Sequence, residues 1–452
     1  MSVTIRMPEA VKAIIGRLAE AGFEAFAVGG CVRDSLLGRQ PQDWDITTAA
    51  EPGQVKALFS RTIDTGIRHG TVTVMAGRER YEVTTYRVDG EYEDSRHPKN
   101  VQFTRSLEED LKRRDFTINA MAYNDQRGLV DIYGGIRDLE SGLIRCVGNA
   151  GERFAEDALR MLRAVRFSAQ LGFPVEEATI AAMKESSASL AKVSAERIQA
   201  ELIKLLVADH PKELLTAFRT GLTAVFLPEF DVMMETPQNN PHHCHSVGMH
   251  ALEAAGHAPA EKVLRLTMLL HDVAKPVCRV TDADGTDHFY GHPAEGSRMA
   301  EVILRRLKCD NDTTEAVCRL IRWHDDNPPV TGRNIRRAVS RIGADLYPGL
   351  FAVKRADILA QSSYRRAEKL AYVDEYERCY GEILRNGECL TVKDLAVSGR
   401  DLTEAGMKPG KELGDMLRYL LEIVLEDPER NQKEQLLAEF YRKLEVNENI
   451  LS

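Results

Sequence analysis

Two carboxylates and two glycines in one short stretch could carry phosphoryl-transfer chemistry. The stretch 27–48 reads AVGGCVRDSLLGRQPQDWDITT, in which Asp43 and Asp45 stand two positions apart. On a strand that spacing puts both side chains on one face, where two carboxylates repel each other unless a cation lies between them. Mg²⁺ is the simplest such cation, because it takes oxygen ligands and usually bridges to a substrate phosphate.

The glycines of the same stretch suit the phosphate side of such a site. Gly29 and Gly30 leave room for a phosphate chain to approach the backbone N–H groups of the helix that follows, and Arg33 lies on its first turn. Taken singly, each feature is common, since Gly-Gly is usually a turn, Asp-x-Asp a solvated strand edge and a helical Arg a surface residue. Their order is far more specific and predicts a site of nucleotidyl transfer.

The elements that must hold these groups follow from the hydrophobic pattern. We expect a helix over 7–21, a buried strand over 26–28, a second strand that carries the two aspartates, and a β-hairpin of 71–75 and 80–86. On the hairpin's second strand, Glu82 is a candidate third carboxylate. The segment 87–99 is charged and punctuated by Gly and Pro, which predicts a mobile loop.

Strand patterns end near Gly148, and the remainder of the chain is predicted to be helical. The fold class is therefore α+β, an α/β head followed by all-α domains. In the helix predicted over 156–172, Arg160, Arg163 and Arg166 recur at every third position and share one broad face. A solvated face and a surface that binds bases and phosphates both fit this spacing, which alone favours the solvated face.

A second group of chemically capable residues follows a Pro/Asn-rich break at 237–241. A lone His on an apolar helix is more often a core residue than a ligand, but here histidines and aspartates recur at helix-sized intervals across one domain length. The candidate ligands are His245, His271, Asp272, His292, His324 and Asp357. His and carboxylate ligands together suit a borderline divalent metal such as Mn, Fe, Co, Ni or Zn, and indicate metal-assisted phosphate-ester hydrolysis.

Composition limits the classes that remain. The chain has 452 residues, of which 43% are hydrophobic and 29% charged, as in an ordinary soluble protein. No apolar run is long enough to span a bilayer, and the eight scattered cysteines, none in C-x-x-C, fit a reducing cytoplasm. The net charge of −9 means that any nucleic-acid contact must come from local basic patches.

The motif series AVGGCVRDSLLG, DWDITT, YEVTTYR, RRDFTINAMAY and EDALRMLRAVRF resembles that of class II tRNA nucleotidyltransferases and bacterial poly(A) polymerases. The H…HD…H…H…D series resembles an HD-superfamily phosphohydrolase. The combination is similar to bacterial CCA-adding enzymes with an HD domain. It implies a polymerase-beta-like nucleotidyltransferase head at 1–148, a helical neck at 149–236, an HD domain at 237–375 and a helical tail that contacts tRNA at 376–452.

The resemblance also implies residue roles. Asp43 and Asp45 would hold Mg²⁺ with Glu82 as third carboxylate, and Gly29, Gly30 and Arg33 would contact the triphosphate. Three further residues would contact the ribose and the phosphates of the nucleotide: Arg114, Asp115 and Asn119. The base would be contacted by Asp157 and Arg160, with Arg163 and Arg166 as neighbouring nucleotide-binding residues. The implied partners are tRNA, ATP and CTP, and the implied reaction adds C, C and A without a nucleic-acid template.

Three other readings stay open at this stage. One is a poly(A) polymerase or A-adding enzyme built on the same head, which the acidic total charge disfavours. Another is an HD phosphohydrolase whose head only binds RNA, which the intact set of head carboxylates disfavours. The last is a pure RNA-binding module, and two ordered sets of acidic and His residues argue against it.

Overall fold

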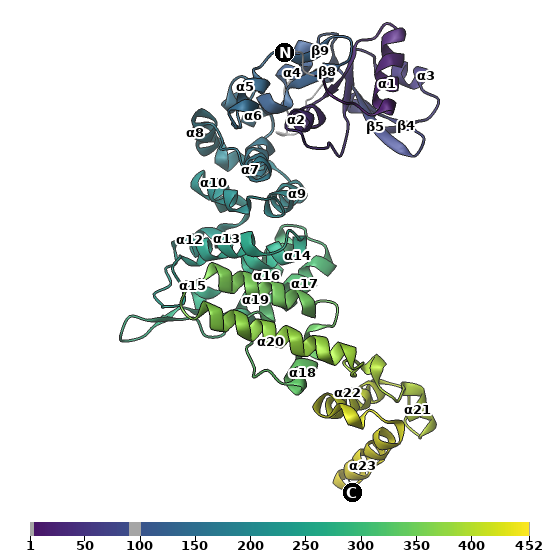
Figure 1. Ribbon diagram of the computed structural model, residues 1–452, viewed down its shortest axis with the longest axis vertical. Helices are drawn as coiled ribbons and strands as arrows, with labels where there is room; N and C mark the ends of the chain where they lie inside the picture. Colours follow the sequence, from purple (N-terminus) through teal and green to yellow (C-terminus); the bar gives the residue numbers. More distant parts are fainter. Residues whose placement is uncertain (1–3, 90–100, 452) are drawn as a thin grey trace. The chain divides into compact units, whose positions relative to one another are not determined.

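The computed structural model describes residues 4–89 and 101–451 and divides into two compact units, Met1–Asp231 and Val232–Ser452 (Figure 1). The loop predicted over 87–99 therefore lies mostly outside the described residues. Its first positions form β6 (Arg87–Asp89), which pairs antiparallel with β7 (Val101–Phe103).

A seven-stranded sheet forms the centre of the head, in the order β3-β4-β5-β2-β1-β8-β9. Every neighbouring pair is antiparallel except β2 and β5, which run parallel. Its strands are β1 (Ala25–Val28), β2 (Ile46–Thr48), β3 (Thr62–Gly66), β4 (Thr71–Ala76), β5 (Glu79–Thr85), β8 (Met121–Asn124) and β9 (Gly128–Asp131).

The local patterns explain these elements. All four residues of β1 are buried, as expected of an apolar run in the middle of a sheet. The helix α1 (Glu9–Glu20) buries one stripe at helical spacing, made of Val11, Ile14, Ile15 and Leu18, which confirms the predicted helix. The predicted hairpin is confirmed as β4 and β5, with Gly77 at φ 64° in its turn.

One detail of the prediction is wrong, because Asp43 and Asp45 do not lie within a strand. They precede β2, which begins at Ile46. The backbone there is nevertheless held to the sheet, since Val28 N donates to Asp45 O at 3.0 Å. Side chains keep the expected alternation, with Trp44 buried between the two exposed aspartates.

Helices complete the first unit. The head contains α1, α2 (Gly30–Leu36), α3 (Pro52–Leu58), α4 (Leu107–Lys112) and α5 (Gly135–Glu140). Six α-helices follow in this unit: α6 (Ala150–Glu156), α7 (Leu159–Leu171), α8 (Glu177–Ser186), α9 (Ala195–Leu206), α10 (Leu214–Arg219) and α11 (Thr223–Phe226). The next helix, α12 (Pro228–Glu235), begins in the first unit and ends in the second. The helix predicted over 156–172 is shorter as α7, because Asp157 Oδ1 accepts from Leu159 N at 3.1 Å and Gly172 ends it at φ 72°.

The second unit is helical, with one exception to the prediction. Val280–Thr281 (β10) and Asp287–His288 (β11) pair as a small hairpin around Gly285 at φ 85°, and the intervening Asp-Ala-Asp-Gly was a turn signal. The helices are α13 (Val247–His257), α14 (Lys262–Leu270), α15 (Lys275–Cys278), α16 (His292–Arg306), α17 (Asn311–Trp323), α18 (Gly332–Ile342), α19 (Tyr347–Ala360), α20 (Arg366–Arg385), α21 (Gly399–Glu404), α22 (Lys411–Glu426) and α23 (Lys433–Leu451).

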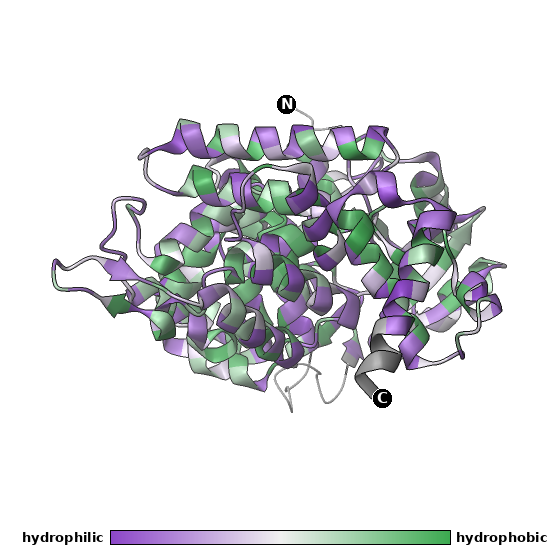
Figure 2. Ribbon diagram, turned by 90° about the horizontal axis from the view of Figure 1, so that it is seen from below, coloured by the Kyte–Doolittle hydropathy of each residue, from purple (hydrophilic) through white to green (hydrophobic). Residues whose placement is uncertain are grey.

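Amphipathic helices account for the burial in this unit. Hydrophobic and hydrophilic residues alternate along the helices in Figure 2. One apolar core lies among α13, α14 and α17–α20, with Tyr347 and Phe351 near its centre, and a smaller one lies under α22. Within the described ranges, no helix combines the length and apolar character needed to cross a membrane.

Candidate active sites

A cavity of about 800 Å³ in the first unit collects most of the predicted head residues. It lies where the start of α2, the segment before β2, the end of α4 and one face of α7 meet. Ten predicted residues line it: Gly29, Gly30, Arg33, Asp43, Asp45, Arg114, Asp115, Asn119, Arg163 and Arg166. A cavity of this volume is within the usual range for small-molecule sites.

The glycine turn lets the backbone approach other groups of the site closely. Gly29 has φ 81°, in the left-handed region that side-chain-bearing residues avoid. A Cβ there would lie 3.1 Å from Arg114 Nη1 and 3.7 Å from Asn119 O. Gly29 also precedes α2, so the first N–H groups of a helix point toward the cavity, as in anion-binding loops.

Replacing Gly29 by alanine is expected to destabilise the protein by about 1–2 kcal/mol through the positive φ, and to raise KM for the nucleotide that the sequence predicts to bind here, through the displaced Arg114. Gly16 is the matched control, because it lies in α1 with nothing within 4 Å of an added Cβ. Gly16→Ala should leave KM unchanged and keep or raise the free energy of unfolding. Equal KM values for the two variants would contradict the role assigned to the turn.

Three carboxylates lie close together at this site, those of Asp43, Asp45 and Glu82. The pKa of Asp45 is raised, because its carboxylate is drawn partly out of water and lies near the charges of Glu82 and Asp43, against the opposing pull of Arg114. Glu82 does not line the cavity itself, but it precedes Val83, which pairs with Ile46 in the register of β5 and β2, so it lies alongside Asp45. Three carboxylates with incomplete compensation are the oxygen donor set that a divalent cation such as Mg²⁺ requires.

A continuous network of polar side chains forms the inner wall. Arg33 Nη1 donates to Asn119 Oδ1 at 2.7 Å, and Asn119 Nδ2 donates to Asp115 Oδ1 at 3.2 Å. Arg163 donates two hydrogen bonds to Asp115 Oδ2, from Nε at 2.9 Å and from Nη2 at 2.6 Å. The buried residues of this wall thus hold two guanidinium groups at set positions beside the cavity.

Substituting Asp115 by asparagine is expected to lower the free energy of unfolding by about 2 kcal/mol at pH 7. This is less than a fully buried pair would lose, because 34% of the Arg163 side chain is exposed. Burial would raise the pKa of Asp115, but Arg163, Arg160 and Asn119 outweigh it and hold the pKa well below its usual range.

The sign of the pH dependence follows from that lowered pKa. The stabilisation by the ionised Asp115 is present above the unfolded-state pKa near 4 and is lost as pH falls through the lower folded-state value. Urea unfolding followed by hydrogen exchange in α7 measures the free energy of unfolding of wild type and of Asp115→Asn. The difference between the two free energies should be constant from pH 7 to pH 5 and should become smaller below pH 4. A gap that widens on acidification would contradict this assignment.

Sequence reasoning missed two residues that hold the arginines of this wall in place, one on α7 and one on α9. The Phe167 ring lies under three guanidinium groups, with Arg33, Arg163 and Arg166 at 5.1, 5.5 and 3.8 Å from its centroid. Glu201 from α9 forms a buried ion pair with Arg166. Phe167 looked like an ordinary core position of the helix, and Glu201 lies too far along the chain for spacing to connect them.

Besides Glu82, two predicted residues do not line this cavity, Asp157 and Arg160. Asp157 caps α7 and accepts from Arg197 Nη2 at 2.7 Å. Arg160 is engaged by Glu156 and donates through Nη2 to Arg113 O at 2.9 Å. A base contact by this pair would require these hydrogen bonds to be exchanged.

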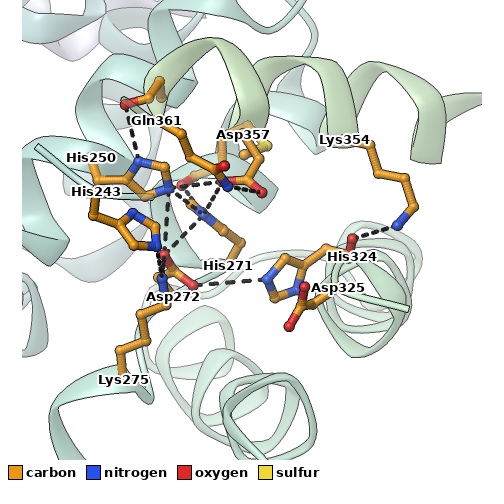
Figure 3. A network of polar contacts seen from close by, with 12 residues as sticks. His243, His250, His271, Asp272, Lys275, His324, Asp325, Lys354, Asp357 and Gln361 are labelled. Atoms are coloured by element: carbon orange, nitrogen blue, oxygen red, sulfur yellow. Dashed lines mark hydrogen bonds and ion pairs between the residues drawn. The ribbon is translucent and has the colours of Figure 1, made fainter. Parts of the chain in front are cut away.

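A second cluster of polar residues is buried among the helices of the second unit (Figure 3). His271 and Asp272 follow α14, and Asp357 comes from α19. The other members are His250 of α13, His292 at the start of α16 and His324 at the end of α17. The four histidines and Asp272 are each at most 6% exposed.

The Asp272 carboxylate divides the cluster into two halves. Its Oδ2 faces His250 and His271, whose Nε2 atoms lie 3.5 and 3.2 Å away. Its Oδ1 faces His292 and His324, with Nε2 at 3.4 and 3.8 Å. Two possible metal-binding groups therefore share Asp272, the first with His250 and His271 and the second with His292 and His324.

The imidazoles are oriented as metal ligands are. The Nδ1 atoms of His271, His292 and His324 lie 2.7–2.8 Å from the backbone carbonyls three residues earlier. Each bond assigns the proton to Nδ1 and leaves the Nε2 lone pair pointing inward. Pairs of Nε2 atoms then face each other, at 3.2 Å between His250 and His271 and 3.4 Å between His292 and His324.

Such an arrangement fits a bound cation better than hydrogen bonds among the side chains. Neither Asp272 oxygen accepts a hydrogen bond of regular geometry from the part of the chain that the structure describes, although Lys275 Nζ lies at 2.8 Å. Burial lowers the pKa of His324 to about 3, which keeps its imidazole neutral. His271 is also buried, yet Asp272 and Asp357 raise its pKa, because their two carboxylates make this half of the cluster attract positive charge. N and O donors in this mixture suit borderline divalent metals.

His245 is the one predicted ligand that the structure does not bring to this cluster, and His250, which the sequence did not single out, lies there instead. Ser246 caps α13 by accepting from Met249 N at 3.3 Å, so His245 precedes the helix. His250 lies one turn further on, on the buried face, with Nε2 at 2.9 Å from Asp357 Oδ1. The serine cap together with the apolar stripe of α13 was the signal that favoured His250. His271, Asp272, His292, His324 and Asp357 lie together as predicted.

Family models match four successive parts of the chain. They are described as the poly A polymerase head domain at residues 25–145, a probable RNA and SrmB-binding site of polymerase A at 172–234, an HD domain at 242–362 and a putative tRNA nucleotidyltransferase domain 2 at 349–440. The first lies in the unit that holds the cavity, the second begins there and ends three residues beyond it, and the HD model spans the buried His and Asp cluster.

Similar proteins match over nearly their whole length. The CCA-adding enzyme of Lactiplantibacillus plantarum is 34% identical, with 98% of this chain and 97% of the relative covered. The enzyme of that name from Limosilactobacillus fermentum is 36% identical, with 95% of each covered. The crystal structure of the Bacillus stearothermophilus CCA-adding enzyme in complex with CTP has a TM-score of 0.72 and 29% identity, covering 98% of this chain and 100% of that one. The Thermotoga maritima CCA-adding enzyme complexed with tRNA shares the fold, with a TM-score of 0.57 at 21% identity and 97% of each chain covered. With full-length relatives above 30% identity and the head cavity in place, this chain belongs to the family of CCA-adding enzymes.

Proposed function

We propose that the head of this chain adds C, C and A to the 3′ end of tRNA from CTP and ATP, and that the cavity lined by Asp43 and Asp45 is where it does so. The observation that carries the assignment is the joining of carboxylates, a glycine turn and fixed guanidinium groups around one cavity. The full-length similarity to CCA-adding enzymes supports the substrate. A tRNA substrate and eight free cysteines agree with a place in the cytoplasm.

Each group of residues around the cavity has its own role in binding the metal or the nucleotide. Asp43, Asp45 and Glu82 would hold Mg²⁺, which supplies charge neutralisation at the attacking and leaving oxygens. The helix start at Gly29 and Gly30, together with Arg33, binds the triphosphate. Arg114, Asp115 and Asn119 contact the ribose and phosphates, and Arg163 and Arg166 add positive charge along the same wall.

In the reaction, the terminal hydroxyl of the tRNA attacks the α-phosphate in line and pyrophosphate leaves. Most of the rate enhancement comes from positioning and charge stabilisation, as in other phosphoryl transfers. For selection of the base, Asp157 offers acceptors and Arg160 a fork of donors. Their present bonds to Arg197 and to Arg113 O would be exchanged for the base edge.

The test is to supply a tRNA that lacks its 3′ CCA with CTP alone, ATP alone, and both, and to determine the product length. Two added nucleotides with CTP and three with both, followed by a stop, are expected. A long ladder with ATP alone would instead identify a poly(A) polymerase. Addition of a single A, and only to tRNA that already ends in CC, would identify an A-adding enzyme.

A second activity is favoured by the buried cluster of the second unit. The shared Asp272 and the two pairs of inward-facing Nε2 atoms support a two-metal site, with Asp357 completing the half that contains His250. Bound Mn, Fe, Co, Ni or Zn would supply a nucleophilic water and stabilise phosphate charge. We assign to this site a hydrolysis of phosphate esters, including 2′,3′-cyclic phosphates.

A further inference from the structure

The metal-binding cluster is reached by two cavities rather than one. The first, of about 510 Å³, is called here the Tyr372 limb, and the second, of about 340 Å³, the Tyr290 limb. Either volume falls within the roughly 300–1,000 Å³ of ordinary ligand pockets. Both limbs share the lining residues that surround the cluster, which are Asn240, His243, His324, Asp325, Asp357 and Gln361. The cluster therefore lies at the junction of two spaces that extend away from it.

The two limbs are lined by different groups. The Tyr372 limb carries Arg365 and Lys369 beside the Tyr372 ring, with Lys369 Nζ 2.5 Å from Gln361 Oε1. The Tyr290 limb contains Lys275, whose Nζ lies 2.8 Å from Asp272 Oδ2. At its rim the Tyr290 side chain is 74% exposed, with one face stacked on His288 at 5.5 Å and an interplanar angle of 5°. Each limb thus combines a cation with a flat aromatic ring.

This geometry discriminates among phosphate esters. A monoester or a terminal cyclic phosphate has its organic group on one side of phosphorus and would fill one limb only. A linear phosphodiester carries two organic groups on phosphorus, and beyond the shared residues the two limbs have separate linings that could each take one. Aromatic rings stack on any nucleobase, and Lys369 of the Tyr372 limb suits a further phosphate, whereas Arg365 is paired with Glu368 of the same lining.

We infer that the second site hydrolyses a linear phosphodiester that carries a nucleoside on each side of phosphorus, with one nucleoside in each limb. The inference rests on the phosphohydrolase activity proposed above. Water adds to phosphorus and the P–O bond to one nucleoside breaks. The departing oxygen takes up the proton that the water gives up, so the products are a nucleotide monoester and a free nucleoside hydroxyl.

Three substrates separate the possibilities in the full-length chain loaded with Mn²⁺: the 5′-phosphorylated dinucleotide pApA, 2′,3′-cyclic AMP and 4-nitrophenyl phosphate. We expect kcat/KM for pApA to exceed that for the other two by tenfold or more. Tyr290→Ala and Lys369→Gln should each raise KM for pApA about tenfold, as expected for loss of one stacking or phosphate contact. An equal rise in KM for 4-nitrophenyl phosphate in both variants would contradict the assignment of one nucleoside to each limb. Tyr441→Ala, at an exposed tyrosine of α23, is the control and should change nothing.

Binding provides a readout that does not need turnover. In an Asp272→Asn background, with saturating CTP to occupy the head, calorimetry should show pApA binding that weakens about tenfold with either limb variant. Hydrolysis of cyclic AMP or 4-nitrophenyl phosphate without pApA would overturn the two-limb inference and leave the phosphohydrolase standing. No metal-dependent hydrolysis of any of the three would overturn both.

Discussion

Replacing Asp45 by alanine is expected to reduce nucleotide addition to tRNA by on the order of 10³-fold or more, the loss seen when a preorganised charge-stabilising group is removed from an active site. The pKa of Asp45 is raised by partial burial of its carboxylate and by the charges of Glu82 and Asp43. Its removal leaves too few oxygen ligands to hold a divalent cation beside the triphosphate. Asp43→Ala should have a similar effect.

The loss should be catalytic rather than structural. Because burial and the neighbouring carboxylates both disfavour the ionised form of Asp45, its substitution should keep or raise the free energy of unfolding. Asp64→Ala is the matched control, since this head carboxylate is 51% exposed and contacts only a surface lysine, Lys56, at 2.9 Å among the ion pairs described. Incorporation of labelled CMP and AMP under single-turnover conditions measures the effect. Retention of full incorporation in either active-site variant would exclude these carboxylates from the reaction.

The head could be predicted in detail because its chemistry is local in the sequence. The glycine turn, Arg33 and the two aspartates lie within 22 positions, so hydrophobic pattern and residue type determine which face each side chain occupies. The backbone hydrogen bond from Val28 to Asp45 then brings the two ends of the stretch together. The strand boundary was misplaced, but the predicted orientation of the two aspartates still holds, because the alternation of side chains extends beyond β2.

Contacts between distant segments could not be predicted in the same way. Glu201 meets Arg166 from another helix, and nothing in the spacing of either helix points to the other. In the second unit, five of the six predicted ligands do lie together, but choosing between His245 and His250 required the exact start of α13. Helix boundaries depend on caps and on tertiary packing, so a pattern of apolar residues leaves them uncertain by a turn.

The division of the second cluster by Asp272 leads to the other prediction of large effect. Asp272→Ala should abolish metal-dependent phosphohydrolase activity and remove both bound transition-metal ions, because each half of the cluster uses one oxygen of this carboxylate. His292→Ala should remove only the ion of its own half, since His250, His271 and Asp357 keep their positions. Addition of C, C and A to tRNA should be unchanged in both variants, as the head cavity has its own carboxylates.

Metal content per chain, measured after dialysis against Mn²⁺ or Co²⁺, distinguishes these cases independently of activity. Relative to wild type, we expect a deficit of two ions for Asp272→Ala and of one for His292→Ala. His245→Ala is the matched control with no deficit, because this histidine precedes α13 and lies outside the metal-binding groups found among the described residues. The visible absorption of bound Co²⁺ reports imidazole coordination and should decrease in the same order. Equal deficits for Asp272→Ala and His292→Ala would mean that the two halves bind as one unit, and a deficit for His245→Ala would restore that residue to the ligand set.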